Sequence, residues 1–144
     1  MSHTEQTTHQ TDHHTGSCLC GGVAFEINGP FEHFFLCHCQ RCRKASGTAH
    51  TANLFSTTAT VVWLSGEDLL CHYHVPESRH ARCFCKNCGS PLPLAQPELG
   101  LVLVPAGCLD TPLAMRPEAH IFTSSRAEWD DDLAALPEFD GLPG

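Results

Sequence analysis

Short apolar runs separated by turn residues cover most of this chain, a pattern typical of β-strands. The first run contains Val23, Phe25 and Ile27 and ends at an Asn-Gly-Pro turn over residues 28–30. The run at residues 99–105 is the most apolar, and we expect it to form a central strand. Further strands, in runs of Val, Thr and aromatic residues, are predicted at residues 31–36, 52–55, 59–64, 69–75 and 81–84. The pattern predicts a mainly β domain.

Helical patterns are scarce and short. We predict one helix over residues 40–45 and another over residues 130–136, followed by an extended polar tail to residue 144. Residues 1–15 are polar and lack any hydrophobic periodicity, so we expect a disordered N-terminal tail. The remaining residues, 16–144, are predicted to form a single domain.

Composition and charge argue against some classes of function. The formal net charge of −8 argues against nucleic acid, which requires a basic surface. No apolar stretch approaches the roughly 20 residues that cross a membrane, and the N-terminal residues do not resemble a secretory signal. We therefore expect a cytoplasmic protein whose ten cysteines stay reduced, and we interpret the closely spaced cysteines as metal ligands. Nothing in the sequence indicates an oligomeric state.

The cysteines fall mainly into three groups. The first is a C-x-C pair, Cys18 and Cys20, and two C-x-C-x-x-C runs follow at residues 37–42 and 83–88. In a strand, residues two apart project from one face, so a C-x-C pair can direct both sulfurs at one ion. A C-x-x-C pair forms a tight turn with converging sulfurs. Zinc prefers such tetrahedral thiolates, and it fills all four positions in a structural site.

Spacing alone leaves the assignment of ligands open. In one partition, the first pair closes a four-thiolate zinc site with Cys85 and Cys88, and residues 37–42 supply a second zinc with only three sulfurs. In the mirror partition, Cys83 joins residues 85–88 at the open metal, and the first pair joins the middle run. A third possibility is that both sites are closed and structural. Cys71 and Cys108 lie in apolar surroundings and are expected to be buried and inert.

Four motifs in a fixed order make the chain similar to a known family. They are GSCLCGGV at residues 16–23, CHCQRCRKASG at 37–47, FCKNCGS at 84–90 and HIFTSSR at 120–126. Together they resemble the glutathione-dependent formaldehyde-activating enzyme family, which also includes centromere protein V-like members. The resemblance implies a β-tent fold of antiparallel sheets with two zinc ions per chain.

The resemblance also implies which cysteines hold each ion. Cys18, Cys20, Cys85 and Cys88 correspond to the family's structural zinc ligands. The middle run supplies the open, catalytic zinc site through Cys37, Cys39 and Cys42. Cys83 departs from the family pattern, and we interpret it as a non-ligand on the opposite strand face. His50 also departs, because many relatives carry an aromatic residue there.

The family's reaction would be carbon–sulfur bond formation, a lyase reaction in reverse. A thiol such as glutathione would occupy the fourth zinc position as a thiolate and attack formaldehyde or a related small aldehyde. His38, expected to point away from the thiols, would have a structural role rather than transfer protons. The alternative is a non-catalytic zinc-binding interaction module of the same fold. The candidate substrate contacts, weaker than the zinc ligands, are Arg41, Arg43, Lys44, His38, His50, Ser125 and Arg126.

Overall fold

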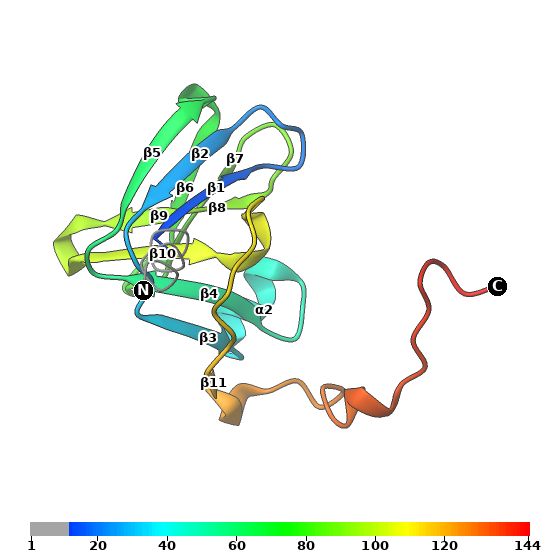
Figure 1. The fold of residues 1–144 in the computed structure, drawn as a ribbon. Helices are drawn as coiled ribbons and strands as arrows, with labels where there is room; N and C mark the ends of the chain where they lie inside the picture. Colours follow the sequence, from blue (N-terminus) through cyan, green and yellow to red (C-terminus); the bar gives the residue numbers. More distant parts are fainter. Residues whose placement is uncertain (1–11) are drawn as a thin grey trace, which may run out of the picture.

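The computed structural model describes residues 12–144 and contains three β-sheets in that range (Figure 1). The prediction of a mainly β protein is confirmed. The first sheet has the order β1-β2-β5, and both of its pairings are antiparallel. Its strands are β1 (His13–Ser17), β2 (Ala24–Asn28) and β5 (Thr60–Ser65).

The second sheet is the largest, with the order β11-β3-β4-β10-β9. Its pairings are antiparallel except for β11, which runs parallel to β3 at one edge. The parallel pairing sets His120 opposite Leu36 and Ile121 opposite Cys37. The five strands are β3 (His33–Cys37), β4 (Thr51–Ser56), β9 (Leu94–Gln96), β10 (Leu101–Pro105) and β11 (Ala119–Ile121).

The third sheet is a hairpin with a short additional strand. Its members are β6 (Leu70–His74), β7 (Ala81–Cys85) and β8 (Pro91–Leu92). A single α-helix within residues 12–144, α2 (Gln40–Ser46), follows β3 and ends at Gly47, whose positive φ of 67° suits glycine. The 3-10 turns are η1 (Glu67–Leu69), η2 (Pro97–Leu99), η3 (Ala106–Cys108), η4 (Thr123–Ser125) and η5 (Leu133–Ala135).

The core forms where the sheets face each other. Phe25 and Ile27 lie two residues apart on β2 and are both fully buried, as expected for one face of a strand. Phe25 also packs edge-on against Trp63 of β5, with ring centroids 5.9 Å apart. Leu54 of β4 and Val104 of β10 contribute fully buried apolar side chains from the second sheet. The apolar runs in the sequence therefore correspond to the faces that meet in the core.

Two sequence-based predictions need correction. Residues 13–15 are part of β1 rather than of a disordered tail, and residues 1–11 lie outside the described range. The helix expected over residues 130–136 is only the 3-10 turn η5. The run at residues 99–105 contains β10, which lies inside the five-stranded sheet with β4 on one side and β9 on the other, as predicted. The predicted helix over residues 40–45 corresponds closely to α2.

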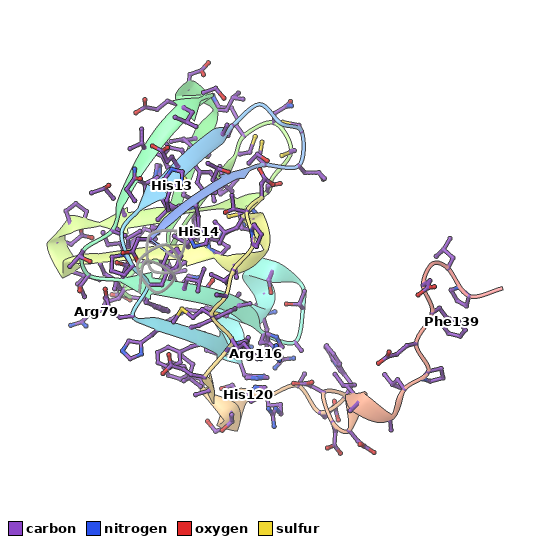
Figure 2. The ribbon with its side chains drawn as sticks, viewed as in Figure 1. His13, His14, Arg79, Arg116, His120 and Phe139 are labelled. Carbon is purple, nitrogen blue, oxygen red and sulfur yellow. The ribbon has the colours of Figure 1, made fainter. Side chains whose placement is uncertain are left out.

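The end of the chain leaves the sheets after β11. Figure 1 shows this segment extending away from the body of the protein, and residues 131–144 are all exposed. Phe139 lies far from the strands in Figure 2 and is 61% exposed. Within residues 12–144, no helix has the length and apolar character needed to cross a membrane.

Candidate metal centres

The sulfur atoms of four cysteines, two from each of two segments that are far apart in the sequence, lie close together. Cys18 and Cys20 lie in the turn between β1 and β2, whereas Cys85 ends β7 and Cys88 lies in the turn that follows. The Sγ atoms of Cys18 and Cys20 are 3.6 Å apart, and those of Cys20 and Cys85 are 3.9 Å apart. Four tetrahedral thiolates at about 2.3 Å from a zinc ion are about 3.8 Å from each other. All four sulfurs lie within 4.8 Å of one another, so the donor set fits a closed zinc site.

Local hydrogen bonds shape the two turns that carry these sulfurs. The Val23 amide donates to Cys18 Sγ at 3.2 Å, and the Gly89 amide donates to the Cys85 carbonyl at 2.7 Å. Gly89 has a positive φ of 79°, which glycine adopts without strain. Hydrogen bonds with the side chain and backbone of Ser90 lower the pKa of Cys88 to about 5. Cys88 is therefore a thiolate at neutral pH, the form that binds metal.

A second group contains three cysteines around the start of α2. Cys37 ends β3, Cys39 is the N-cap residue of α2, and Cys42 lies in its first turn. Their sulfurs lie within 4.8 Å of one another. The Cys42 amide donates to Cys39 Sγ at 3.3 Å, so the helix N-terminus helps to orient the group.

This geometry corrects one sequence argument. The two C-x-C pairs that give both sulfurs to one group, Cys18/Cys20 and Cys37/Cys39, do not lie within a strand, because Cys20 is in a turn and Cys39 caps a helix. The sulfurs converge through turn geometry rather than because they share a strand face.

Burial makes the three-cysteine group costly to ionise without a cation. Cys37 and Cys42 are each only 7% exposed, and burial raises the pKa of both thiols. Burial also acts to raise the pKa of Cys39, but hydrogen bonds from the Cys42 backbone and from the other two thiols outweigh it and lower the pKa. Three convergent sulfurs in partly buried surroundings are donors that zinc prefers. The residues therefore fit a zinc ion that would compensate the charge of buried thiolates.

Three cysteines lie outside both groups. Cys83 is buried in the core and lies two residues before Cys85 on β7, so the two share a strand face. Our expectation that Cys83 faces the opposite side is wrong, although its sulfur does not join the four-cysteine group. Cys71 and Cys108 are half-buried rather than fully buried, and the Cys108 thiol donates to the Pro105 carbonyl at 3.0 Å.

The basic residues near the three-cysteine group have different surroundings. Arg41 and Lys44 are exposed on α2. Arg43 instead donates from Nη1 to the Ser125 carbonyl at 2.9 Å, which links α2 to η4. Arg126 Nε lies 3.4 Å from Asp130 Oδ2, in an ion pair along the same C-terminal segment.

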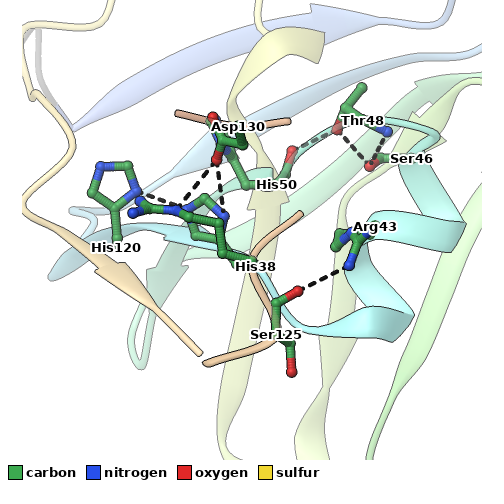
Figure 3. Close-up of polar contacts among 9 residues, drawn as sticks. His38, Arg43, Ser46, Thr48, His50, His120, Ser125 and Asp130 are labelled. Atoms are coloured by element: carbon green, nitrogen blue, oxygen red, sulfur yellow. Dashed lines mark hydrogen bonds and ion pairs between the residues drawn. The ribbon is translucent and has the colours of Figure 1, made fainter. Parts of the chain in front are cut away.

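A histidine cluster lies beside the three-cysteine group in the chain. His38 is fully buried, and its Nε2 is 2.8 Å from Nδ1 of His120 on β11 (Figure 3). Its ring centroid is 5.1 Å from that of His50, and its Nδ1 is 3.4 Å from Asp130 Oδ2. Burial, followed by the charges of Arg126, His50 and His120, lowers the pKa of His38. The Asp130 carboxylate acts in the opposite direction and raises the pKa, but burial and the cationic groups outweigh it, so the neutral imidazole is favoured.

Two members of this cluster were not singled out from the sequence. His120, labelled in Figure 2, is the middle residue of β11, and the parallel pairing with β3 brings it to His38. His120 opens the fourth family motif, but nothing in its spacing indicated a partner. Asp130 belongs to a run of three aspartates at residues 130–132, which resembles an ordinary solvated acidic segment.

A pocket of about 350 Å³ lies elsewhere, with none of the cysteines in its lining. Apolar side chains dominate it, and His14 of β1 contributes a polar group. Its residues are Asp12, His14, Pro30, Phe31, Leu113, Ala114 and Met115. This pocket is therefore separate from the cysteine groups.

Comparison with known proteins agrees with the cysteine pattern. Residues 13–125 match the sequence model of a family described as glutathione-dependent formaldehyde-activating enzyme. Among solved structures, the chain is similar to a Rhodobacter sphaeroides protein at 22% identity and a TM-score of 0.52. The match covers 74% of this chain and 97% of that one. At this identity the structural likeness establishes the fold.

Proposed function

This chain belongs to the glutathione-dependent formaldehyde-activating enzyme family, and on that premise we propose that it joins a small thiol to formaldehyde or a related small aldehyde. Glutathione is the first thiol to consider, because the family description names it. A bond forms between the thiol sulfur and the carbonyl carbon, and the carbonyl oxygen takes up the proton that the thiol gives up. The product is a hemithioacetal, which for glutathione and formaldehyde is S-hydroxymethylglutathione. The reverse reaction breaks the carbon–sulfur bond, as a lyase does.

The observation that carries this proposal is the difference between the two cysteine groups. Cys18, Cys20, Cys85 and Cys88 can supply all four ligands of a structural zinc. Within residues 12–144, no fourth Cys, His, Asp or Glu donor joins the group around the start of α2. A three-ligand zinc keeps a position for substrate, which catalytic zinc sites require. We therefore propose two zinc ions per chain with different roles.

Each part of the three-cysteine group has a task in this proposal. Cys37, Cys39 and Cys42 would hold the zinc ion, which would supply the positive charge that lowers the pKa of a substrate thiol, so that the thiolate would be available at neutral pH. Cys39 is the most exposed of the three residues, so the substrate would approach from its side. The Cys42 amide stabilises the Cys39 sulfur through its hydrogen bond.

Arg41 and Lys44 supply positive charge on the exposed side of α2. Glutathione has two carboxylates, which the arginine can bind in fork geometry and the lysine as a point charge. Arg43 has a different role, since its bond to the Ser125 carbonyl holds the helix against η4. A cytoplasmic location also fits, because the closely spaced cysteines are unpaired thiols and such thiols persist in reducing compartments.

The direct test is adduct formation with formaldehyde and glutathione, followed by NMR on protein loaded with two zinc ions. The protein should accelerate the approach to equilibrium. Cys39→Ser should abolish the acceleration and lower the zinc content by one ion, while the far-UV circular dichroism stays unchanged. Cys71→Ser removes a cysteine outside both groups and should behave as the unmodified protein. If fully loaded protein gives no acceleration with any small aldehyde, the non-catalytic interaction module is the better explanation.

Binding of the glutathione carboxylates is tested separately. The double substitution Arg41→Gln and Lys44→Gln should raise KM for glutathione roughly threefold to tenfold, since exposed charge pairs contribute little each. The same variant should act normally on 2-mercaptoethanol, which has no carboxylate. Equal losses with both thiols would mean that these side chains do not bind substrate carboxylates.

A further inference from the structure

His38, His50 and Asp130 bring three ligand atoms together outside the cysteine groups. The atoms lie within 4.8 Å of one another and come from three separate segments of the chain. His38 lies between β3 and α2, His50 immediately precedes β4, and Asp130 follows η4. Figure 3 shows His38 joined to His120 on one side and to Asp130 on the other.

Two nitrogen atoms in this cluster have no hydrogen-bond partner. They are Nδ1 of His38 and Nδ1 of His50, and both atoms are buried. The His38 side chain is 0% exposed, so solvent water cannot supply the missing hydrogen bond. A buried polar atom without a partner costs about 1–3 kcal/mol. Two such atoms on neighbouring rings point to a group that would bind them both.

His120 fixes the other side of the His38 ring. The distance from His38 Nε2 to His120 Nδ1 is 2.8 Å, a good hydrogen bond. When His38 donates this bond, its Nδ1 carries a lone pair and faces the Asp130 carboxylate oxygen at 3.4 Å. Two acceptors at that distance repel each other unless a cation lies between them. Nitrogen and oxygen ligands at about 2.1 Å from a tetrahedral ion are about 3.4 Å apart.

We propose that His38, His50 and Asp130 form a third metal site, which takes a divalent first-row transition-metal ion through two imidazole nitrogens and one carboxylate oxygen. Its donors differ from the thiolates of the cysteine groups and suit borderline cations such as zinc or cobalt. Two histidines and one carboxylate leave further coordination positions for water or another ligand. His120 acts from outside the ligand set, because its hydrogen bond orients the His38 ring. The site does not depend on the proposed thiol chemistry.

Arg126 is the competing partner of the carboxylate. Its Nε lies 3.4 Å from the same Asp130 oxygen, so the guanidinium neutralises part of the negative charge. The Arg126 side chain is 39% exposed and can turn toward solvent, whereas the Asp130 side chain is only 11% exposed. Each carboxylate oxygen also has more than one lone pair. It can therefore accept a hydrogen bond from the arginine and bind a metal ion at the same time. The ion pair therefore positions Asp130 and leaves a ligand direction free.

Cobalt(II) is a suitable probe because its spectrum reports the ligand type. Protein with both cysteine groups filled by zinc is dialysed against Co²⁺, and cobalt and zinc per chain are then measured together. One cobalt should bind while both zinc ions are retained. Its visible d–d bands should appear without the near-ultraviolet charge-transfer bands of sulfur ligation. No bound cobalt, or cobalt that displaces zinc and shows sulfur bands, would overturn the proposal.

Variants locate the extra ion. His50→Phe and Asp130→Asn should each weaken cobalt binding at least tenfold while zinc content and circular dichroism are unchanged. The matched controls are Asp131→Asn, an exposed neighbouring aspartate, and His33→Gln, an exposed histidine beside Glu118. Both controls should bind cobalt as the unmodified protein does. If either ligand variant keeps full affinity, or if His33→Gln loses it, the ion is bound elsewhere and the proposed site is wrong.

Discussion

The thiols of Cys88 and Cys108 differ strongly in acidity, although both residues are half-buried. Hydrogen bonds with Ser90 lower the pKa of Cys88 to about 5, which prepares it for a metal. Burial raises the pKa of Cys108 to about 12, and its thiol donates to the Pro105 carbonyl. The same type of side chain is thus a candidate metal ligand at position 88 and a protected packing group at position 108.

Cys108 should resist alkylation in the folded protein. With a pKa of about 12, roughly one molecule in ten thousand is a thiolate at pH 8, and the thiolate is the form that reacts. Treatment with iodoacetamide followed by peptide mass spectrometry should leave Cys108 unlabelled while protein in guanidinium is labelled fully. The slow rate should rise about tenfold per pH unit toward pH 10. Rapid labelling at pH 8 would show that burial does not protect this thiol.

The cysteine groups could be anticipated from the sequence, but the histidine cluster could not. Spacings of two and three residues keep Cys37, Cys39 and Cys42 near one another along the chain, so a single local turn is enough to bring their sulfurs together. His38 instead meets His120, which is 82 residues further along the chain. Only the parallel pairing of β11 with β3 creates that contact, and no local pattern predicts a pairing at such separation.

At the scale of elements, the sequence patterns missed β1 and the shorter strands β8, β9 and β11, and β1 is the longest of these. Its residues, HHTGS, contain no apolar side chain, so the usual strand pattern is absent. The strand forms because β2 offers a complete antiparallel edge, with Gly16 opposite Phe25. The sequence predicts β10 because its apolar run is long. Its position beside β4 depends on the pairings that β10 makes with its two neighbouring strands. In this protein, sequence patterns predict where strands form better than they predict which strands pair with each other.

Gly16→Ala tests whether β1 is integral to the fold. A Cβ at this position would collide with the Phe25 ring and with the Cys108 carbonyl. Overpacking of this kind costs typically about 1–3 kcal/mol, so thermal unfolding should occur several degrees lower. Gly107→Ala is the control, since a Cβ there meets nothing within 4 Å. Equal melting temperatures for the two variants would contradict the packing of β1 described above.

A second prediction at this scale follows from the hydrogen bond that joins α2 to η4. Arg43→Gln removes the bond to the Ser125 carbonyl, and such a bond is worth roughly 1–2 kcal/mol. Hydrogen–deuterium exchange should then become faster in β11 and residues 122–130, with zinc content unchanged. Lys44→Gln alters an exposed charge on the same helix and should have no effect on exchange. Unchanged exchange in Arg43→Gln would mean that other contacts hold the segment.

At the scale of the whole molecule, the four-cysteine group joins sheets that are separate in hydrogen bonding. Cys18 and Cys20 precede β2 of the first sheet, whereas Cys85 and Cys88 belong to the end of the third. Few other polar contacts reinforce this junction in the described chain, one being the Leu19 amide bond to Ser90 Oγ at 2.8 Å. The three-cysteine group joins only neighbouring elements, β3 and α2. The two groups therefore contribute differently to global stability.

This difference predicts the order of stability of two single substitutions. Structural zinc sites supply about 10–16 kcal/mol of apparent binding energy in small peptides, as much as the whole stability of an ordinary domain. Cys88→Ser should therefore lower the melting temperature by more than about 10 °C, whereas Cys39→Ser should lower it by only a few degrees. Thermal unfolding of both variants, with zinc measured in each, distinguishes them. If Cys39→Ser were the more damaging, the group around α2 would have the structural role, and no open metal would remain for the proposed chemistry.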